Sequence, residues 1–424
     1  MNRRLPAALL LLSILAGCAA FEPKNPSPAE PPVSSGATAT VRILAYNSES
    51  VRTTYLAYLR KQFPDVTIVF DYVPLEYYSG TLNAQMLSDS GPDLIEVGGE
   101  TRLLAGSGML LDLTGQPFIG RYTPKSLIPY SVQGHVYATP LQSWFEGIFY
   151  NKKLFSRYGL APPETFDAFI ALHKKLAARG VKPQIMGAQS WEPMMKQSIA
   201  LVNSEFYSRP ESEGFDAAFD DGKARLADGW LPAVTEWSRL IREGCLTPDM
   251  LGYSYEQALA EFAEEGAAMW ESGPWSADAI LQRNPEIKLG MFPVPGRRKG
   301  GGWLVGGPGS ALAVNKNSRN VAAALRILSA TASPEAQKAL LKDNEGMSSV
   351  VGVHADLGPI YSDCRAALEA GRIYAPWTAT WTYGNPIVET YGKALQDVLA
   401  GQKTVKEALE EADALNKKLH QTFR

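Results

Sequence analysis

The chain has 424 residues, a formal net charge of −3 and 20% charged residues. This mildly acidic balance argues against nucleic acid or an anionic surface as the partner. A chain of this length exceeds one ordinary hydrophobic core, so we expect two lobes.

The first residues resemble a bacterial lipoprotein signal. Two arginines precede an apolar run, Leu5–Leu15, which is too short to span a bilayer, and small residues then lead to Cys18. In this interpretation residues 1–17 are a signal peptide cut before Cys18, which then carries lipid. The alternative is an ordinary signal peptide with a chance cysteine.

Residues 18–40 predict a tether. Five prolines and very few large apolar side chains follow Cys18, so this stretch cannot bury enough surface to fold and favours extended backbone. We expect it to hold a folded body on the outer face of the cytoplasmic membrane, or facing the periplasm if the cell has two membranes.

The folded part begins with patterns of an α/β lobe. Val41–Tyr46 is a short apolar run typical of a buried strand, and further strand patterns lie at 66–73 and 93–97. A helix is expected between the first two strands, and Pro64 ends it. Its apolar face is Val51, Tyr55, Leu59 and Phe63. The order strand, helix, strand predicts parallel strands with right-handed crossovers.

Later segments continue this alternation. Strand patterns occur at 136–141 and 144–151, and a helix is expected from about Thr165. Thr404 and Glu407 form the sequence pattern of a capping box ahead of an amphipathic C-terminal helix. The glycine-rich stretches at 296–302 and 306–310 predict loops or crossings between the lobes.

Polar residues follow two of the expected strands. In open parallel sheets, ligands bind beyond the carboxyl ends of the strands. Asn47 and Glu49 follow the first strand, and Glu100 follows the strand at 93–97. Carboxylates and exposed backbone N–H groups there suit a neutral, hydroxyl-rich ligand. The alternative is that both are solvated loop tips.

Six of the nine tryptophans fall into two groups. Trp230 and Trp237 lie seven residues apart in a helical context, which favours core packing. Four others lie in stretches rich in Gly, Pro, Ser or Thr: Trp191, Trp275, Trp377 and Trp381. Flat rings can stack on the apolar faces of a sugar, so these loop tryptophans favour carbohydrate binding, although large aromatics also anchor loops in cores.

Other chemistry has weak support. Cys245 and Cys364 could form a disulfide, but two buried free thiols are the commoner outcome. The four scattered histidines indicate no metal site, and no cofactor motif is present. A glycoside hydrolase needs two carboxylates about 5–9.5 Å apart. The candidates are Glu49, Glu100, Glu146, Glu192 and Glu271. Nothing singles out a pair, so we expect no enzyme.

Several motifs recur together along the chain. Residues 136–180 contain P-L-x-x-W, Y-N-K-x-L-F and G-L-x-x-P-x-T-F, and PDLIEVGG, GAAMWESGPW, ALAVNKNSRNVAAALRIL and ALQDVLAGQKTVKEAL occur elsewhere. In these residues and in their order, the chain resembles the family 1 extracellular solute-binding proteins, the maltodextrin-binding-protein-like receptors of ABC importers.

The resemblance implies an α/β fold with two lobes, of the type II periplasmic-binding-protein kind, hinged by three crossings with the ligand in the cleft between lobes. Carried onto this chain, the crossings are expected near 147–151, 302–310 and 347–353. The expected lobes are 41–148 with 306–350, and 149–305 with 351–424.

The resemblance also implies ligand-binding positions. They are Asn47, Glu49, Glu100, Arg102, Trp144, Trp191, Glu192 and Trp275, with Trp377 or Trp381 as a further ring. Trp275 aligns most closely with a stacking aromatic of the maltodextrin receptor. The chain departs from that receptor's pattern around Glu96 and at Trp144, which argues against maltodextrin itself.

We therefore expect a lipid-anchored, extracytoplasmic monomer that binds a carbohydrate, in particular an oligosaccharide, and delivers it to the membrane subunits of an ABC importer. No cofactor, metal or nucleic acid is expected. Two alternatives stay open: a secreted lipoprotein that acts on glycosides, and a ligand sensor for a two-component kinase.

Overall fold

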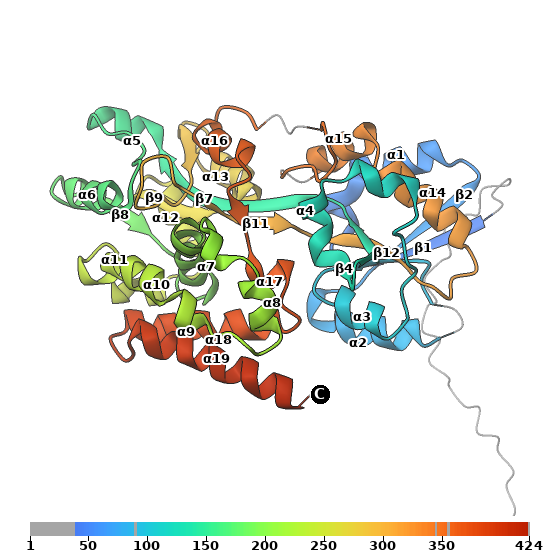
Figure 1. The fold of residues 1–424 in the computed structure, drawn as a ribbon. Helices are drawn as coiled ribbons and strands as arrows, with labels where there is room; N and C mark the ends of the chain where they lie inside the picture. The colour runs from blue at the N-terminus through green and yellow to red at the C-terminus, as the bar shows by residue number, and fades with distance from the viewer. Residues whose placement is uncertain (1–38, 89–90, 344–345, 354–356, 423–424) are drawn as a thin grey trace, which may run out of the picture.

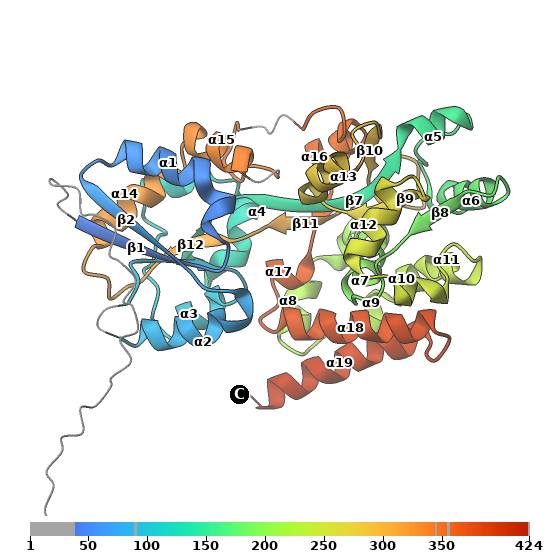
Figure 2. The same cartoon turned by 180° about the vertical axis from the view of Figure 1, so that it is seen from behind.

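A computed structural model describes residues 39–88, 91–343, 346–353 and 357–422. The chain forms two α/β lobes that lie side by side, the first with the blue strands and the second with the red C-terminal helices (Figures 1 and 2). The expected signal peptide, Cys18 and most of the linker lie outside the described residues. Within the described part, no helix is long and apolar enough to cross a membrane.

The first lobe is built on a five-stranded sheet with helices on both faces. The strand order is β2 (Val66–Tyr72), β1 (Ala39–Ala45), β3 (Leu94–Val97), β12 (Ala311–Val314) and β6 (Ala138–Pro140). β1 runs parallel to β2 and β3, as predicted, whereas β12 is antiparallel to β3 and β6. A separate hairpin joins β4 (Ser131–Val132) and β5 (His135–Val136).

Alternating side chains divide the first-lobe core into two layers. Ile43 and Leu312 pack with α1 (Thr53–Gln62), α14 (Val321–Thr331) and α15 (Pro334–Asp343). Leu44 and Ala311 face the opposite way, toward α2 (Leu75–Met86) and α3 (Thr101–Gly106). Both faces of the sheet are therefore buried, which is why its strands read as continuous apolar runs. α4 (Pro124–Leu127) lies beside β6.

The second lobe has a six-stranded sheet. Its strands are β13 (Ile373–Tyr374), β11 (Leu304–Pro308), β7 (Ser143–Asn151), β9 (Ala267–Ser272) and β8 (Lys182–Ile185), and β10 (Leu289–Phe292) also pairs with β7. Its helices on one face include α6 (Phe166–Ala177), α7 (Glu192–Val202), α10 (Leu231–Trp237), α18 (Gly384–Leu399) and α19 (Val405–Thr422). On the other face lie α12 (Tyr255–Ala263), α13 (Ala277–Arg283) and α16 (Arg365–Glu369).

Short helices complete the second lobe. They are α5 (Lys152–Arg157), α8 (Phe215–Asp220), α9 (Leu226–Gly229), α11 (Arg239–Arg242) and α17 (Pro376–Ala379). Trp230 and Trp237 are fully buried in this lobe, as predicted. Cys245 and Cys364 are buried free cysteines, so the disulfide alternative is wrong.

Local sequence signals explain the helix ends. The Thr165 side chain accepts a hydrogen bond from the Ala168 N–H at the start of α6. At α19, the predicted capping box is formed: the Thr404 side chain accepts from the Glu407 N–H, and Glu407 accepts from the Thr404 N–H. These caps satisfy backbone donors that have no partner inside the helix.

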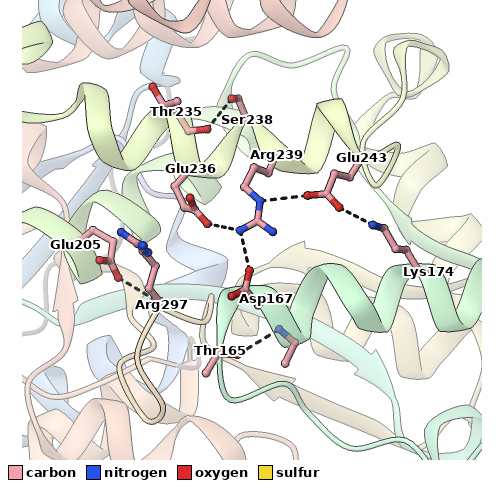
Figure 3. A network of polar contacts seen from close by, with 11 residues as sticks. Thr165, Asp167, Lys174, Glu205, Thr235, Glu236, Ser238, Arg239, Glu243 and Arg297 are labelled. Atoms are coloured by element: carbon pink, nitrogen blue, oxygen red, sulfur yellow. Dashed lines mark hydrogen bonds and ion pairs between the residues drawn. The ribbon is translucent and has the colours of Figure 1, made fainter.

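A surface network fastens α6 to α11 (Figure 3). Arg239 donates to Asp167 over 2.7 Å and to Glu236 and Glu243, and Glu243 accepts from Lys174 over 2.5 Å. None of these residues lines the space between the lobes. The network therefore supports the scaffold of the second lobe.

Two of the three crossings lie outside the expected ranges. All of β7 pairs with second-lobe strands, beginning with Ser143 against Pro308. The first crossing therefore lies before Ser143, not at 147–151. The second lies at Gly309 and Ser310, between β11 and β12, inside the expected range. For the third, Val353 still packs in the first lobe and Tyr361 in the second, so this crossing lies after the expected range 347–353.

Candidate ligand-binding site

A cleft of about 640 Å³ lies between the two lobes. The first lobe and the crossings supply Tyr46, Asn47, Arg52, Ser79, Gly98, Gly99, Glu100, Leu103, Tyr130, Gln142, Gly309 and Ser310. The second lobe supplies Trp144, Pro308, Trp377, Thr378, Trp381, Thr382, Gly384, Asn385 and Pro386. The cleft lies at the carboxyl ends of β1 and β3, which is where ligands bind in open parallel sheets.

A buried ion pair organises the first-lobe wall. The Arg52 guanidinium donates to Glu96 Oε1 and to Ser310 Oγ, each over 3.1 Å, and both charged side chains are almost fully buried. The Asn47 side chain donates to the same Glu96 oxygen over 2.7 Å. Arg52 thus links the first lobe to the second crossing, and Glu96 fixes the orientation of Asn47.

Glu100 and three tyrosines complete this wall. Glu100 Oε2 accepts a hydrogen bond from the Gly98 N–H over 3.0 Å, which closes the turn after β3. The Tyr46 ring meets the Tyr78 ring edge-on at 5.2 Å, and the Tyr130 hydroxyl donates to the Gly309 carbonyl. Burial raises the pKa of Tyr46 well above its ordinary value, so the phenol stays neutral. The first-lobe wall is therefore mainly polar and rich in hydrogen-bonding groups.

The second-lobe side presents aromatic rings. Trp144 lies at the centre, with its ring centroid 6.2 Å from that of Trp377 and 6.5 Å from that of Trp275. Trp275 is 42% exposed. Its ring folds back over Gly273, where an added Cβ would come within 2.2 Å of it. Glycine at this position therefore allows the ring to lie beside Trp144 and continue the aromatic surface.

Trp381 has a different role from Trp275. It is only 3% exposed, because Trp230 stacks on it with ring centroids 5.6 Å apart and Phe219 contacts it at 4.5 Å. Sequence reasoning expected either Trp377 or Trp381 to supply a further ring. The structure leaves only a small part of Trp381 at the cleft, so it supports the wall and offers little surface for stacking.

A charged cluster lies behind Trp144. The Lys196 ammonium is 5.6 Å from the Trp144 ring centroid and pairs with Glu146 over 2.6 Å and with Glu192 over 2.7 Å. Burial opposes the charge on Lys196, but these carboxylates outweigh it and raise its pKa. Burial also raises the pKa of Glu146 and, with the nearby negative charge of Glu146, that of Glu271. The cluster fixes the back of Trp144 and does not line the cleft.

The structure brings five of the predicted ligand residues to the cleft. They are Asn47, Glu100, Trp144, Trp377 and Trp381. Trp275 adjoins them through Trp144. Arg102, on α3, reaches across to the second lobe, where it donates to the Ala379 carbonyl over 3.5 Å. It lies between the lobes without lining the cleft.

Three predicted residues lie elsewhere. Glu49 is an exposed residue that pairs with Arg60 over 2.9 Å. Trp191 packs against Gly392 of α18, and Glu192 pairs with Lys196. None of the three lines the cleft, and their expected ligand role stays a prediction.

Sequence reasoning missed several wall residues, of which Arg52 had a detectable signal. It lies one turn before Tyr55 and Leu56, on the buried side of α1, and a cation on an apolar helix face indicates a buried partner. Ser310, Thr382 and Asn385 carried no such signal. Among the described residues, no group of His, Cys, Asp and Glu could hold a metal ion.

Two α/β lobes with a ligand-sized cleft at their junction define a two-lobed solute-binding protein of the type II fold. Comparison with family models agrees: the bacterial extracellular solute-binding protein family matches residues 47–338. The chain belongs to this family, whose members are extracytoplasmic binding proteins.

Similar proteins are found among curated sequences and solved structures. The multiple sugar-binding protein of Streptococcus mutans is 26% identical over 65% of this chain and 66% of its own. The melibiose/raffinose/stachyose-binding protein MelE of Bacillus subtilis is 24% identical over 93% and 92%. A family 1 extracellular solute-binding protein from Bifidobacterium longum subsp. infantis superposes with a TM-score of 0.78 at 23% identity, covering 89% and 99% of the two chains. The solved structures support the fold.

Proposed function

We propose that this protein is an extracytoplasmic receptor that captures an oligosaccharide in the cleft between its lobes and delivers it to an ABC importer. The observation that carries the proposal is the contrast between the two sides of the cleft. Asn47, Glu100 and Ser310 offer hydrogen-bonding groups on one side, and Trp144 and Trp377 offer rings on the other. A sugar has matching surfaces: a rim of hydroxyls and apolar C–H faces.

The relatives support a neutral oligosaccharide as the ligand class. Two of them are named for binding multiple sugars and for binding melibiose, raffinose and stachyose. The cleft adds a physical argument. Arg52 is the one cation among the described residues that line the cleft, and Glu96 neutralises it, so these residues offer no unpaired cation to an anionic sugar. Closure of the lobes would bury the sugar, and ligand drives closure only through its higher affinity for the closed state.

The arrangement of carboxylates supports binding without catalysis. Of the five acids considered for glycoside hydrolysis, only Glu100 lines the cleft among the described residues. Glu146 and Glu271 are buried beside Lys196, behind Trp144. A hydrolase would need two carboxyl groups on either side of the scissile bond.

Calorimetric titration tests the receptor function. Purified protein is titrated with raffinose, stachyose, a maltodextrin and their monosaccharides, and the same mixtures are analysed for products. We expect micromolar or tighter binding of at least one oligosaccharide, recovered intact. Cleaved sugar would establish the glycoside-active alternative, and no binding to any sugar would contradict the proposed ligand class.

The lipid anchor is a separate part of the proposal. We propose that the mature protein begins at Cys18 and is held by lipid on that residue as a monomer. In cells fed labelled palmitate, we expect the wild type to take up label and to sediment with membranes, and the Cys18→Ala variant to do neither. Equal membrane association of both would contradict the anchor. Co-purification with permease subunits, rather than with a sensor kinase, would identify the importer as partner.

A further inference from the structure

Two carboxylates of α8 hold the segment that forms the second-lobe side of the cleft. Asp220 accepts hydrogen bonds from the Thr382 N–H over 2.5 Å and from the Thr382 hydroxyl over 3.0 Å. Asp216 accepts from the Trp381 indole N–H over 3.0 Å. The two acids are four residues apart and therefore lie on one face of the helix. Consecutive residues of the wall, Trp381 and Thr382, are thus fixed by consecutive turns of α8.

Asp216 is held in turn by two tyrosines. The hydroxyls of Tyr207 and Tyr374 both donate to its carboxylate. Asp216 is 9% exposed, and its donors Tyr207, Tyr374 and Trp381 are neutral groups. Burial raises the pKa of Asp216, and the three hydrogen bonds act in the opposite direction. A buried carboxylate with three donors has little freedom to move, because losing any one of them leaves a polar group unsatisfied.

The same segment is packed tightly on its other side. The Trp381 ring lies against Trp230 and Phe219, as described above. At Gly384, an added Cβ would come within 2.1 Å of the Trp377 carbonyl oxygen, so the start of α18 lies directly against the backbone of Trp377. The contacts that fix Trp381 and Thr382 therefore also limit the movement of the other residues in the segment 377–384, which lies beside the cleft.

We propose that Asp216 and Asp220 are positioning residues for ligand binding, which hold residues 377–384 in the binding arrangement before the sugar arrives. This inference rests on the proposed receptor function. Neither acid lines the cleft among the described residues, so neither touches the sugar. Their contribution is preorganisation, because a side chain that is loose in the free protein must be ordered when the sugar binds, which weakens affinity.

The test compares three single variants by calorimetric titration with the tightest-binding sugar. Asp216→Asn and Asp220→Asn keep the size of the side chain but replace one acceptor oxygen by a donor. Each α8 variant frees one wall side chain, Trp381 or Thr382, and should weaken affinity about 2- to 13-fold. Asp413→Asn is the matched control, because Asp413 also accepts two hydrogen bonds, from the Leu226 and Ala227 N–H groups, at a second-lobe site outside the cleft. The control should lower the unfolding temperature without changing affinity.

A spectroscopic readout separates positioning from general stability. The indole N–H signal of Trp381, assigned by its loss in Trp381→Phe, should shift or broaden in ligand-free Asp216→Asn and stay unchanged in Asp413→Asn. If Asp216→Asn does not fold, Asp220→Asn carries the affinity test.

The outcomes distinguish this inference from the proposed function. If wild type binds a sugar and neither α8 variant loses more affinity than Asp413→Asn does, the positioning role is wrong and the receptor function stands. If wild type binds no sugar, both the positioning role and the proposed receptor function are contradicted. Weakened binding in the two α8 variants alone, with a displaced Trp381 signal, supports the inference.

Discussion

Replacing Trp275 by alanine tests the aromatic side of the cleft. A buried tryptophan contributes up to about 250 Å² of surface, and the side chain here is 42% exposed. If a sugar covers that exposed part, roughly 100 Å² is removed from water, worth about 2.5 kcal/mol at ~25 cal/mol per Å². Part of this is offset by the cost of ordering ligand and protein. We therefore expect affinity to fall by about 1–2.5 kcal/mol, roughly 5- to 70-fold.

The assay is calorimetric titration, with thermal unfolding measured on the same samples. Because Trp275 is half-exposed and its closest ring contact is Trp144, the unfolding temperature should change little. Trp303→Ala removes the same side chain at a site that does not line the cleft, and its affinity for the sugar should equal that of wild type. Unchanged affinity in Trp275→Ala, or an equal loss in Trp303→Ala, would refute the reasoning.

Three further predictions concern buried groups and caps. Arg52→Ala leaves Glu96 buried without its cation and should lower the free energy of unfolding by about 3–5 kcal/mol, whereas Arg60→Ala, at an exposed pair, should cost at most about 1 kcal/mol in the same denaturant titration. Equal losses would contradict the buried pair. Glu271 has a pKa raised by burial above its ordinary 4.5, so the folded state binds the extra proton and wild type loses stability as pH rises above that value. Glu271→Gln should therefore become more stable than wild type from about pH 4.5 toward neutrality, and parallel stability curves would show that Glu271 is not shifted. Thr404→Ala should cost about 1 kcal/mol by removing the cap of α19, and Thr404→Ser should restore most of it; no loss in either variant would mean that this cap is not needed.

Local patterns predicted the elements well. The strands around Val41–Tyr46 and 66–73, the helix ended by Pro64 and the capped helix at Thr404 are all present. These features depend on short-range periodicity and on side-chain-to-backbone hydrogen bonds, both of which are visible in a few consecutive residues. The buried packing of Trp230 and Trp237 followed from the same helical periodicity.

The crossings and the site were harder to predict, because they depend on distant partners. Nothing local in Ser143–Asn151 reveals that its whole length pairs with β9, β10 and β11, which lie roughly 120–165 residues further along the chain. Trp381 looked like an available ring until Trp230 and Phe219 were found against it. The same holds for Glu49, whose loop position suited a ligand but whose partner is Arg60.

The most direct test of the account is a crystal structure of the protein with the oligosaccharide that binds most tightly in the titration. We predict a pyranose ring in van der Waals contact with Trp275 or Trp377, hydroxyls hydrogen-bonded to Asn47 or Glu100, and both lobes touching the sugar. A sugar bound to one lobe alone, outside the residues that line the cleft, would contradict the account.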